Sequence, residues 1–189
     1  MISAFAPLLP ARVGRTARPA RAAKRVRAKA ADTRSLAWCV LLFTLLLQAA
    51  LALYPAALKL GAIQSSAAFK IASGYTMLAL LAFAFGFGAL RRLPALAPHV
   101  RRLHELHQVA GLAIVVLLAL HVGQRPTGFL LGTFHAMALG VACGALRTLV
   151  GPRAGRAASA GLLGIHIAAS CLVAAAALLH LYFVYAYTA

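Results

Sequence analysis

The chain has 189 residues, of which 63% are hydrophobic, and it contains 19 lysines and arginines against two acidic residues, Asp32 and Glu105. Only 11% of the residues are charged, whereas charged residues make up roughly a quarter of an ordinary soluble domain. A disordered chain is excluded too, because such chains are poor in apolar residues. Apolar runs of about 20 residues, the length that crosses a bilayer, recur along the sequence. The sequence therefore predicts an all-α integral membrane protein embedded in the lipid bilayer.

Residues 1–34 form a basic region before the first apolar run, and they hold nine of the 19 lysines and arginines. We expect this tail to be separate from a transmembrane domain at 35–189. The tail resembles the Ala- and Arg-rich transit peptides of chloroplast proteins, which implies a thylakoid location. The alternatives are a cytoplasmic tail on anionic lipid and a bacterial inner-membrane protein. A nucleic-acid partner is not expected, because no soluble fold with a basic face and aromatic readers is present.

Five apolar segments are each long enough to cross the bilayer, and glycines and prolines lie in the connections between them. We expect a bundle of five transmembrane helices, in which helices two to five form a haem-binding core. Aromatic residues gather at the end of the last segment, where an interfacial belt belongs. The expected segments are 36–58, 68–90, 103–122, 129–150 and 160–187.

The basic residues between the segments predict the orientation. If the N-terminus is inside, the nine basic residues of the tail, four at 91–102 and three at 147–156 lie inside, and three lie outside. This distribution follows the positive-inside rule. It places the C-terminus outside, and the third and fifth helices then run in the same direction.

Four of the seven histidines form two equally spaced pairs: His107 and His121 on the third segment, and His166 and His180 on the fifth. Fourteen positions cover about 21 Å of helix axis and return to within about 40° of the starting direction. Each pair therefore lies on one helix face, with one member toward each membrane surface. An ionisable residue within a membrane usually faces the bundle interior and has a function.

Because the two helices run in the same direction, His107 is expected to face His166, and His121 to face His180. Two imidazoles that converge from facing helices form an axial ligand pair for haem iron. The sequence thus predicts two haem b groups, one at each pair. Gly111, on the same face, leaves room for a flat macrocycle, although small residues also mediate ordinary helix packing in membranes.

Three further residues are candidate cofactor contacts. Arg101 is expected near the inner pair and Arg125 near the outer pair, since arginine binds carboxylates such as haem propionates well. Charge that merely sets the topology is the alternative. His135 is expected in the outer half of the fourth segment, level with His121. There it could touch a haem edge or a quinone, or simply pack.

The string His107-Gln108-Val109-Ala110-Gly111-Leu112, continued to His121, and the stretch from His166 to His180 resemble two helices of the ferric-reductase-like transmembrane family. Quinol-oxidising cytochromes b have a similar paired arrangement. The resemblance spans residues 68–187, although the family usually has six spans. It implies a membrane b-type cytochrome that carries electrons across the bilayer, as a haem subunit of a quinone- or ferric-reductase-like system. A quinol, a flavoprotein or a small redox protein would be the donor or acceptor.

Two other functions fit parts of the pattern. A pigment-binding or assembly subunit of a photosynthetic or respiratory complex would hold lipid-facing macrocycles on single histidines. A channel or transporter would use histidines as proton relays, and it would normally bring acids or broken helices into the membrane. No segment contains an Asp. We therefore expect an electron-transfer subunit rather than a self-contained enzyme, and we assign no catalytic residue.

Overall fold

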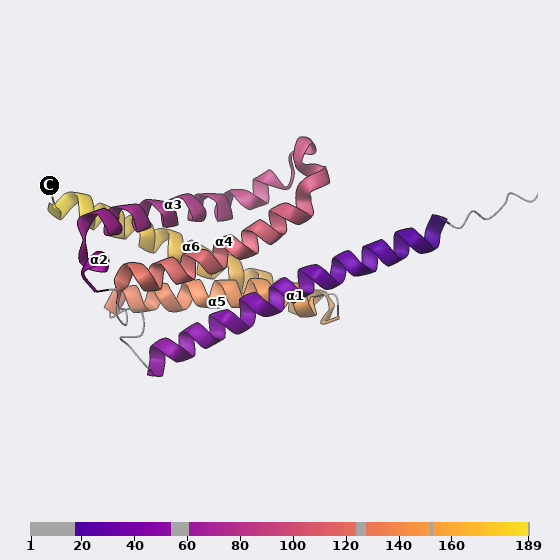
Figure 1. Ribbon diagram of the computed structural model, residues 1–189, viewed down its shortest axis with the longest axis horizontal. Helices are drawn as coiled ribbons and strands as arrows, with labels where there is room; N and C mark the ends of the chain where they lie inside the picture. Colours follow the sequence, from indigo (N-terminus) through magenta and orange to yellow (C-terminus); the bar gives the residue numbers. More distant parts are fainter. Residues whose placement is uncertain (1–17, 54–60, 124–127, 152, 189) are drawn as a thin grey trace, which may run out of the picture. The chain divides into compact units, whose positions relative to one another are not determined.

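A computed structural model of the chain describes residues 18–53, 61–123, 128–151 and 153–188. Within these ranges all regular structure is helical (Figure 1). Five of the helices are long and apolar enough to cross a membrane. The prediction of an all-α membrane bundle with five spans is therefore confirmed. The helices are α1 Arg18–Leu53, α2 Ala62–Ser65, α3 Ala67–Leu90, η1 Pro94–His99, α4 Val100–Val122, α5 Gly128–Val150 and α6 Gly155–Thr188.

The chain divides into two units, Met1–Asp32 and Thr33–Ala189. In the first unit the described part, from residue 18, is helical and forms the beginning of α1. The second unit contains all five apolar helices, beginning with Thr33–Leu53 of α1. That the basic tail is a separate functional region stays a prediction, because the division into two units describes geometry alone.

Local sequence explains where the helices begin and end. Pro94 lies at the first position of η1, where its missing N–H costs no helical hydrogen bond. Gly123 ends α4 in the left-handed conformation, with φ of 77°, which glycine adopts without steric cost. The short helix α2 and the turn η1 were not expected. The end of the first predicted segment, at 54–58, lies outside the described residues.

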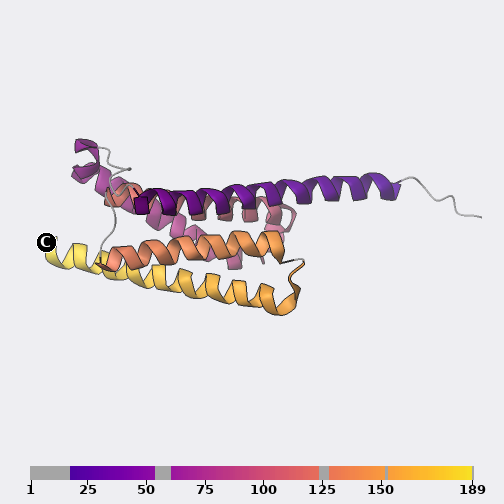
Figure 2. The ribbon, with the colours of Figure 1, turned by 90° about the horizontal axis from the view of Figure 1, so that it is seen from below.

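Close packing runs through the bundle in chain order, with α3 on α4, α4 on α5, and α5 on α6. Figure 1 shows that α4 and α6 run in the same direction, and Figure 2 shows α5 and α6 side by side. Across the bundle, the hydroxyls of Tyr75 on α3 and Tyr185 on α6 are 2.6 Å apart. Helices α3–α6, the second to fifth spans, thus pack together as a bundle.

The membrane-spanning part of α1 packs against α4 and α5. Its buried side chains join a shared apolar cluster with α4, α5 and Val173 of α6. The opposite side of α1 exposes large apolar side chains, among them Trp38 and Leu46. Exposed apolar surface on this scale is what a bilayer covers. The main members of the cluster are Ala37, Val40, Leu41, Ile114, Val115, Ala119, Phe134, Met137, Val141 and Ala145.

Candidate functional site

The four paired histidines meet between α4 and α6. The ring centres of His107 and His166 are 5.9 Å apart, and the ring planes are inclined by 80°. The ring centres of His121 and His180 are 6.3 Å apart, with an inclination of 84°. In each pair the histidines occupy equivalent positions on α4 and α6, so the two helices run in the same direction. The structure therefore brings both predicted pairs together.

These separations fit two imidazoles that bind one metal ion from opposite sides. Metal–imidazole bonds are about 2.0–2.1 Å long, and the centre of a five-membered ring with bonds near 1.35 Å lies about 1.1 Å from each ring atom. Two such ligands have ring centres about 6.3 Å apart. Direct aromatic packing also gives separations of about 4.5–7 Å. Distance alone therefore does not decide between a ligand pair and a packed pair.

The hydrogen bond of His166 favours the ligand pair. Its Nδ1 lies 2.7 Å from the carbonyl oxygen of Gly140 on α5. A carbonyl oxygen only accepts, so His166 carries its proton on Nδ1, and Nε2 keeps a lone pair. Metal-binding histidines typically donate their other ring N–H to a carbonyl or carboxylate in this way, which fixes the tautomer and the ring orientation.

His121 is oriented by a serine instead. Its Nδ1 lies 2.8 Å from the Ser73 hydroxyl on α3, and this hydroxyl lies 2.6 Å from the carbonyl oxygen of Phe69. Because Ser73 donates its hydrogen to that carbonyl, its oxygen accepts from His121 Nδ1. His121 therefore has the same tautomer as His166. Each pair contains one histidine whose Nε2 is available to a metal.

The other two histidines have different surroundings. His107 stacks on Phe87, with ring centres 4.5 Å apart and planes inclined by 15°, which fixes the plane of its imidazole. Its Nδ1 is buried and has no hydrogen-bond partner among the described residues. A buried polar atom without a partner is costly and is often explained by a missing ligand or water. The His180 ring, in contrast, is exposed.

A cavity of about 420 Å³ lies at the His107–His166 pair, within the range of small-molecule and cofactor sites. It is lined by α3, α4, α5 and α6, together with Val40 of α1. The apolar part of the wall is formed by side chains such as Leu81, Phe85 and Met137. The polar part contains Arg91, His104, Gln108, Arg147 and Thr148.

Glycines keep this cavity open. A Cβ on Gly144 would lie 3.3 Å from His166 Nδ1, and a Cβ on Gly111 would lie 3.2 Å from Cγ2 of Val141. Both distances are tighter than ordinary van der Waals contact, so neither position accepts a side chain without displacing its neighbour. Both glycines line the cavity. The predicted site residue Gly111 thus lies where the sequence placed it, on the face of α4 that carries His107.

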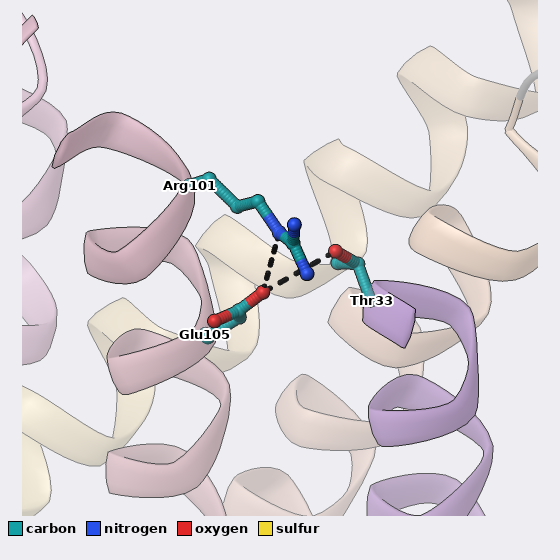
Figure 3. Close-up of polar contacts among 3 residues, drawn as sticks. All are labelled: Thr33, Arg101 and Glu105. Atoms are coloured by element: carbon teal, nitrogen blue, oxygen red, sulfur yellow. Dashed lines mark hydrogen bonds and ion pairs between the residues drawn. The ribbon is translucent and has the colours of Figure 1, made fainter. Parts of the chain in front are cut away.

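Arg101 does not line the cavity. Its Nε forms an ion pair of 2.7 Å with Glu105 Oε1, and the same oxygen accepts a hydrogen bond of 3.4 Å from the Thr33 hydroxyl. Figure 3 shows the three side chains converging between α4 and α1. Arg101 turns toward α1 and not toward the cavity because its partner Glu105 lies one helical turn further along α4. Arg125, the other arginine expected to bind the cofactor, lies outside the described residues.

His135 is not brought to either histidine pair. Its Nδ1 lies 3.1 Å from Oε1 of Gln48 on α1, and its ring is exposed. Five positions separate His135 from Gly140, the partner of His166, which is about 7.5 Å of helix axis. The expectation that His135 lies level with His121 stays a prediction, because the contact with Gln48 does not fix its depth relative to the two pairs.

The carbonyl end of α4 is capped by side chains from two other helices. Gln64 of α2 donates to the carbonyl oxygen of Leu120, and Lys70 of α3 donates to that of His121. Carbonyls in the last turn of a helix have no partner within the helix, and a cation there also complements the helix dipole. These contacts hold the end of α4 that carries His121.

Several of these residues were missed at the level of sequence. Ser73 and Phe87 lie on the second span and Arg91 directly follows it, and only the packing of α3 on α4 reveals their place at the site. Arg147 was noted only as a charge that sets the topology. The sequence does contain a signal for Gly140 and Gly144, because two small residues four positions apart on a helix indicate a close contact with another helix.

Comparisons with known proteins do not place the chain. No protein-family model, no curated protein and no solved structure matches it. Within the described ranges there is also no group of three or more His, Cys, Asp or Glu side chains that could hold a metal ion. A porphyrin supplies its own equatorial nitrogens, so the two-histidine sites found here have the donor set that haem requires.

Proposed function

We propose that this chain is a membrane b-type cytochrome that carries electrons across the bilayer. In this proposal His107 and His166 hold one haem b, and His121 and His180 hold a second. The observation that carries the proposal is that both pairs meet at the spacing of a metal-bridged pair, with Nδ1 of His166 and of His121 committed to a hydrogen bond. Packing alone does not require one oriented tautomer in each pair.

Different residues have different roles in such a site. Gly140 and Ser73 accept from Nδ1 and so turn Nε2 of His166 and His121 toward a ligand. Phe87 holds the ring plane of His107. The apolar walls exclude water from the cavity. A haem with two histidine ligands has no open coordination position, so it supplies one-electron transfer rather than oxygen chemistry.

The spacing of the two sites supports transfer across the membrane. Fourteen residues separate the histidines on each helix, which is about 21 Å, while the hydrocarbon core of a bilayer is about 30 Å thick. One site therefore serves each leaflet. The charge distribution supports an orientation with the N-terminus inside, so that His107 and His166 lie toward the inner surface. The basic tail supports a thylakoid location.

The exposed ring of His180 favours one alternative. A pigment-binding subunit would hold a lipid-facing macrocycle on a single exposed histidine, and His180 is an exposed residue of α6. Extraction of the purified protein into organic solvent separates the two possibilities. A chlorophyll spectrum in the extract supports the pigment-binding subunit, and a haem spectrum supports the cytochrome.

Electron transfer across a sealed membrane tests the proposal. The full chain is reconstituted with haem into liposomes that contain ferricyanide, and an impermeant reductant is added outside. We expect the trapped ferricyanide to be reduced in liposomes that contain the protein. We expect no faster reduction than in empty liposomes when His121 is replaced by alanine. Equal rates for the native chain and for empty liposomes would contradict the proposal.

A further inference from the structure

The cavity at His107 and His166 has two chemically different ends. Most of its wall is apolar, whereas the end of the bundle where α3 ends, α4 begins and α5 ends contributes Arg91, His104 and Arg147. These three come from separate helices and are far apart in sequence. A molecule that fits such a cavity has an apolar body and an anionic edge.

The two arginines are tied to the site by their neighbours. The Arg91 guanidinium lies 5.9 Å from the centre of the Phe87 ring, and this ring stacks on His107. Arg147 precedes Thr148, whose hydroxyl accepts from Gln108 Nε2 at 3.2 Å. Both arginines are exposed, so they line the cavity from its rim rather than from its depth.

No acid in the cavity wall balances these cations. The chain has two acidic residues, and Glu105, the one whose side chain is described, is engaged by Arg101. Gln108 has an unsatisfied hydrogen-bond acceptor, because the residue is 7% exposed and its Oε1 has no partner among the described residues. Buried polar atoms are normally satisfied. The polar end is therefore incomplete without a ligand.

We infer that Arg91 and Arg147 bind the carboxylates of the molecule held between His107 and His166, so that the chain selects a porphyrin with free acid groups. The inference rests on the proposed function and deepens it. Guanidinium groups bind carboxylates through paired, charge-assisted hydrogen bonds. It replaces Arg101, which the sequence favoured for this role, with two arginines that line the cavity.

The test compares iron protoporphyrin IX with its dimethyl ester, which has the same ring and iron but no free acid. Each is titrated into the haem-free full chain in detergent micelles, and binding is followed by the Soret absorption. Empty micelles and the His166→Ala variant define binding that does not involve this site. A charge-assisted hydrogen bond contributes roughly 1.5–3 kcal/mol, so the native chain is expected to prefer the free acid by about tenfold or more.

Matched variants assign the preference to particular residues. We expect the combined Arg91→Met and Arg147→Met variant to bind the two porphyrins equally. Arg92→Met serves as the control, because Arg92 is adjacent to Arg91 and exposed but is not part of the cavity wall. It should retain the preference of the native chain.

The outcomes separate this inference from the proposed function. If the native chain binds both porphyrins equally well at His166, the carboxylate site is wrong while the cytochrome stands. If the double variant keeps the preference, the assignment to Arg91 and Arg147 is wrong. If the native chain binds neither porphyrin, the proposed function itself fails. The ratio measured on the native chain decides the first point even if a variant does not fold.

Discussion

His166 on α6 donates its Nδ1 proton to the backbone carbonyl of Gly140 on α5, over 2.7 Å. This carbonyl would normally accept only from its own helix. A glycine one turn further on, Gly144, leaves the imidazole the space that it occupies. The tight packing of α5 on α6 thus sets the tautomer of a histidine whose ring centre lies 5.9 Å from that of His107.

Gly144→Ala tests this arrangement. The added Cβ would lie 3.3 Å from His166 Nδ1 and 3.4 Å from Cε1, so the ring has to shift. We expect the variant to lose haem from the His107–His166 site while the other site keeps its haem, measured as haem bound per chain. Gly132→Ala on the same helix is the control, because its Cβ would meet nothing within 4 Å. Unchanged haem content in the Gly144 variant would show that the ring tolerates the contact.

Ser73→Ala removes the acceptor that orients His121. Loss of such a partner typically lowers the affinity for a metal by about 10–100-fold, because the ligand becomes less basic and less well oriented. A less basic imidazole stabilises ferric iron less, so the midpoint potential at this site should rise. Redox titration with optical detection measures both effects. Thr76→Ala, which removes a hydroxyl bonded within the same helix, should leave the potential unchanged.

Gln64→Ala tests the cap on α4. The side chain is 5% exposed, and its loss leaves the carbonyl of Leu120 without this donor. A buried polar group without a partner costs about 1–3 kcal/mol. We expect the free energy of unfolding in mixed micelles to fall by about this amount. Ser65→Ala, at an exposed hydroxyl of the same short helix, should change it little, and equal effects of the two substitutions would argue against a specific cap.

Arg101→Met is expected to leave the haem content unchanged. Arg101 pairs with Glu105 four residues along α4, and both side chains are about a third exposed. Such helical pairs contribute roughly 0.3–0.5 kcal/mol to stability and less in high salt. Haem quantification and thermal unfolding of the variant check this. A selective loss of haem would return Arg101 to the cofactor site.

The sequence predicts the parts of this structure that depend on periodicity. Apolar length defines the five spans. The shared spacing of His107–His121 and His166–His180, with one span between the two helices, predicts which histidines meet. Helix α2 could not be predicted in this way, because a helix of four residues has no periodic pattern. Its Gln64 caps α4 through a contact 56 positions away in sequence.

The environment of the site was less predictable, because it is set by packing between helices. Arg101, at the beginning of α4, and Arg147, near the end of α5, are both basic residues at the same end of the bundle, because the two helices run in opposite directions. Only the position of Glu105 and the rotation of α4 determine that Arg101 faces α1 while Arg147 lines the cavity. Likewise, Ser73 becomes a partner of His121 only when α3 packs on α4. The sequence thus yields the histidine pairs but not the residues that orient them.

The number of haems bound per chain, measured by the pyridine haemochrome spectrum of the purified native chain and of its single histidine variants, tests the central claim most directly. The account predicts two b-type haems in the native chain. It predicts one in each of the variants His107→Ala, His166→Ala, His121→Ala and His180→Ala, and two in the control His99→Ala. A native chain without haem, or variants that all keep the native number, would contradict it.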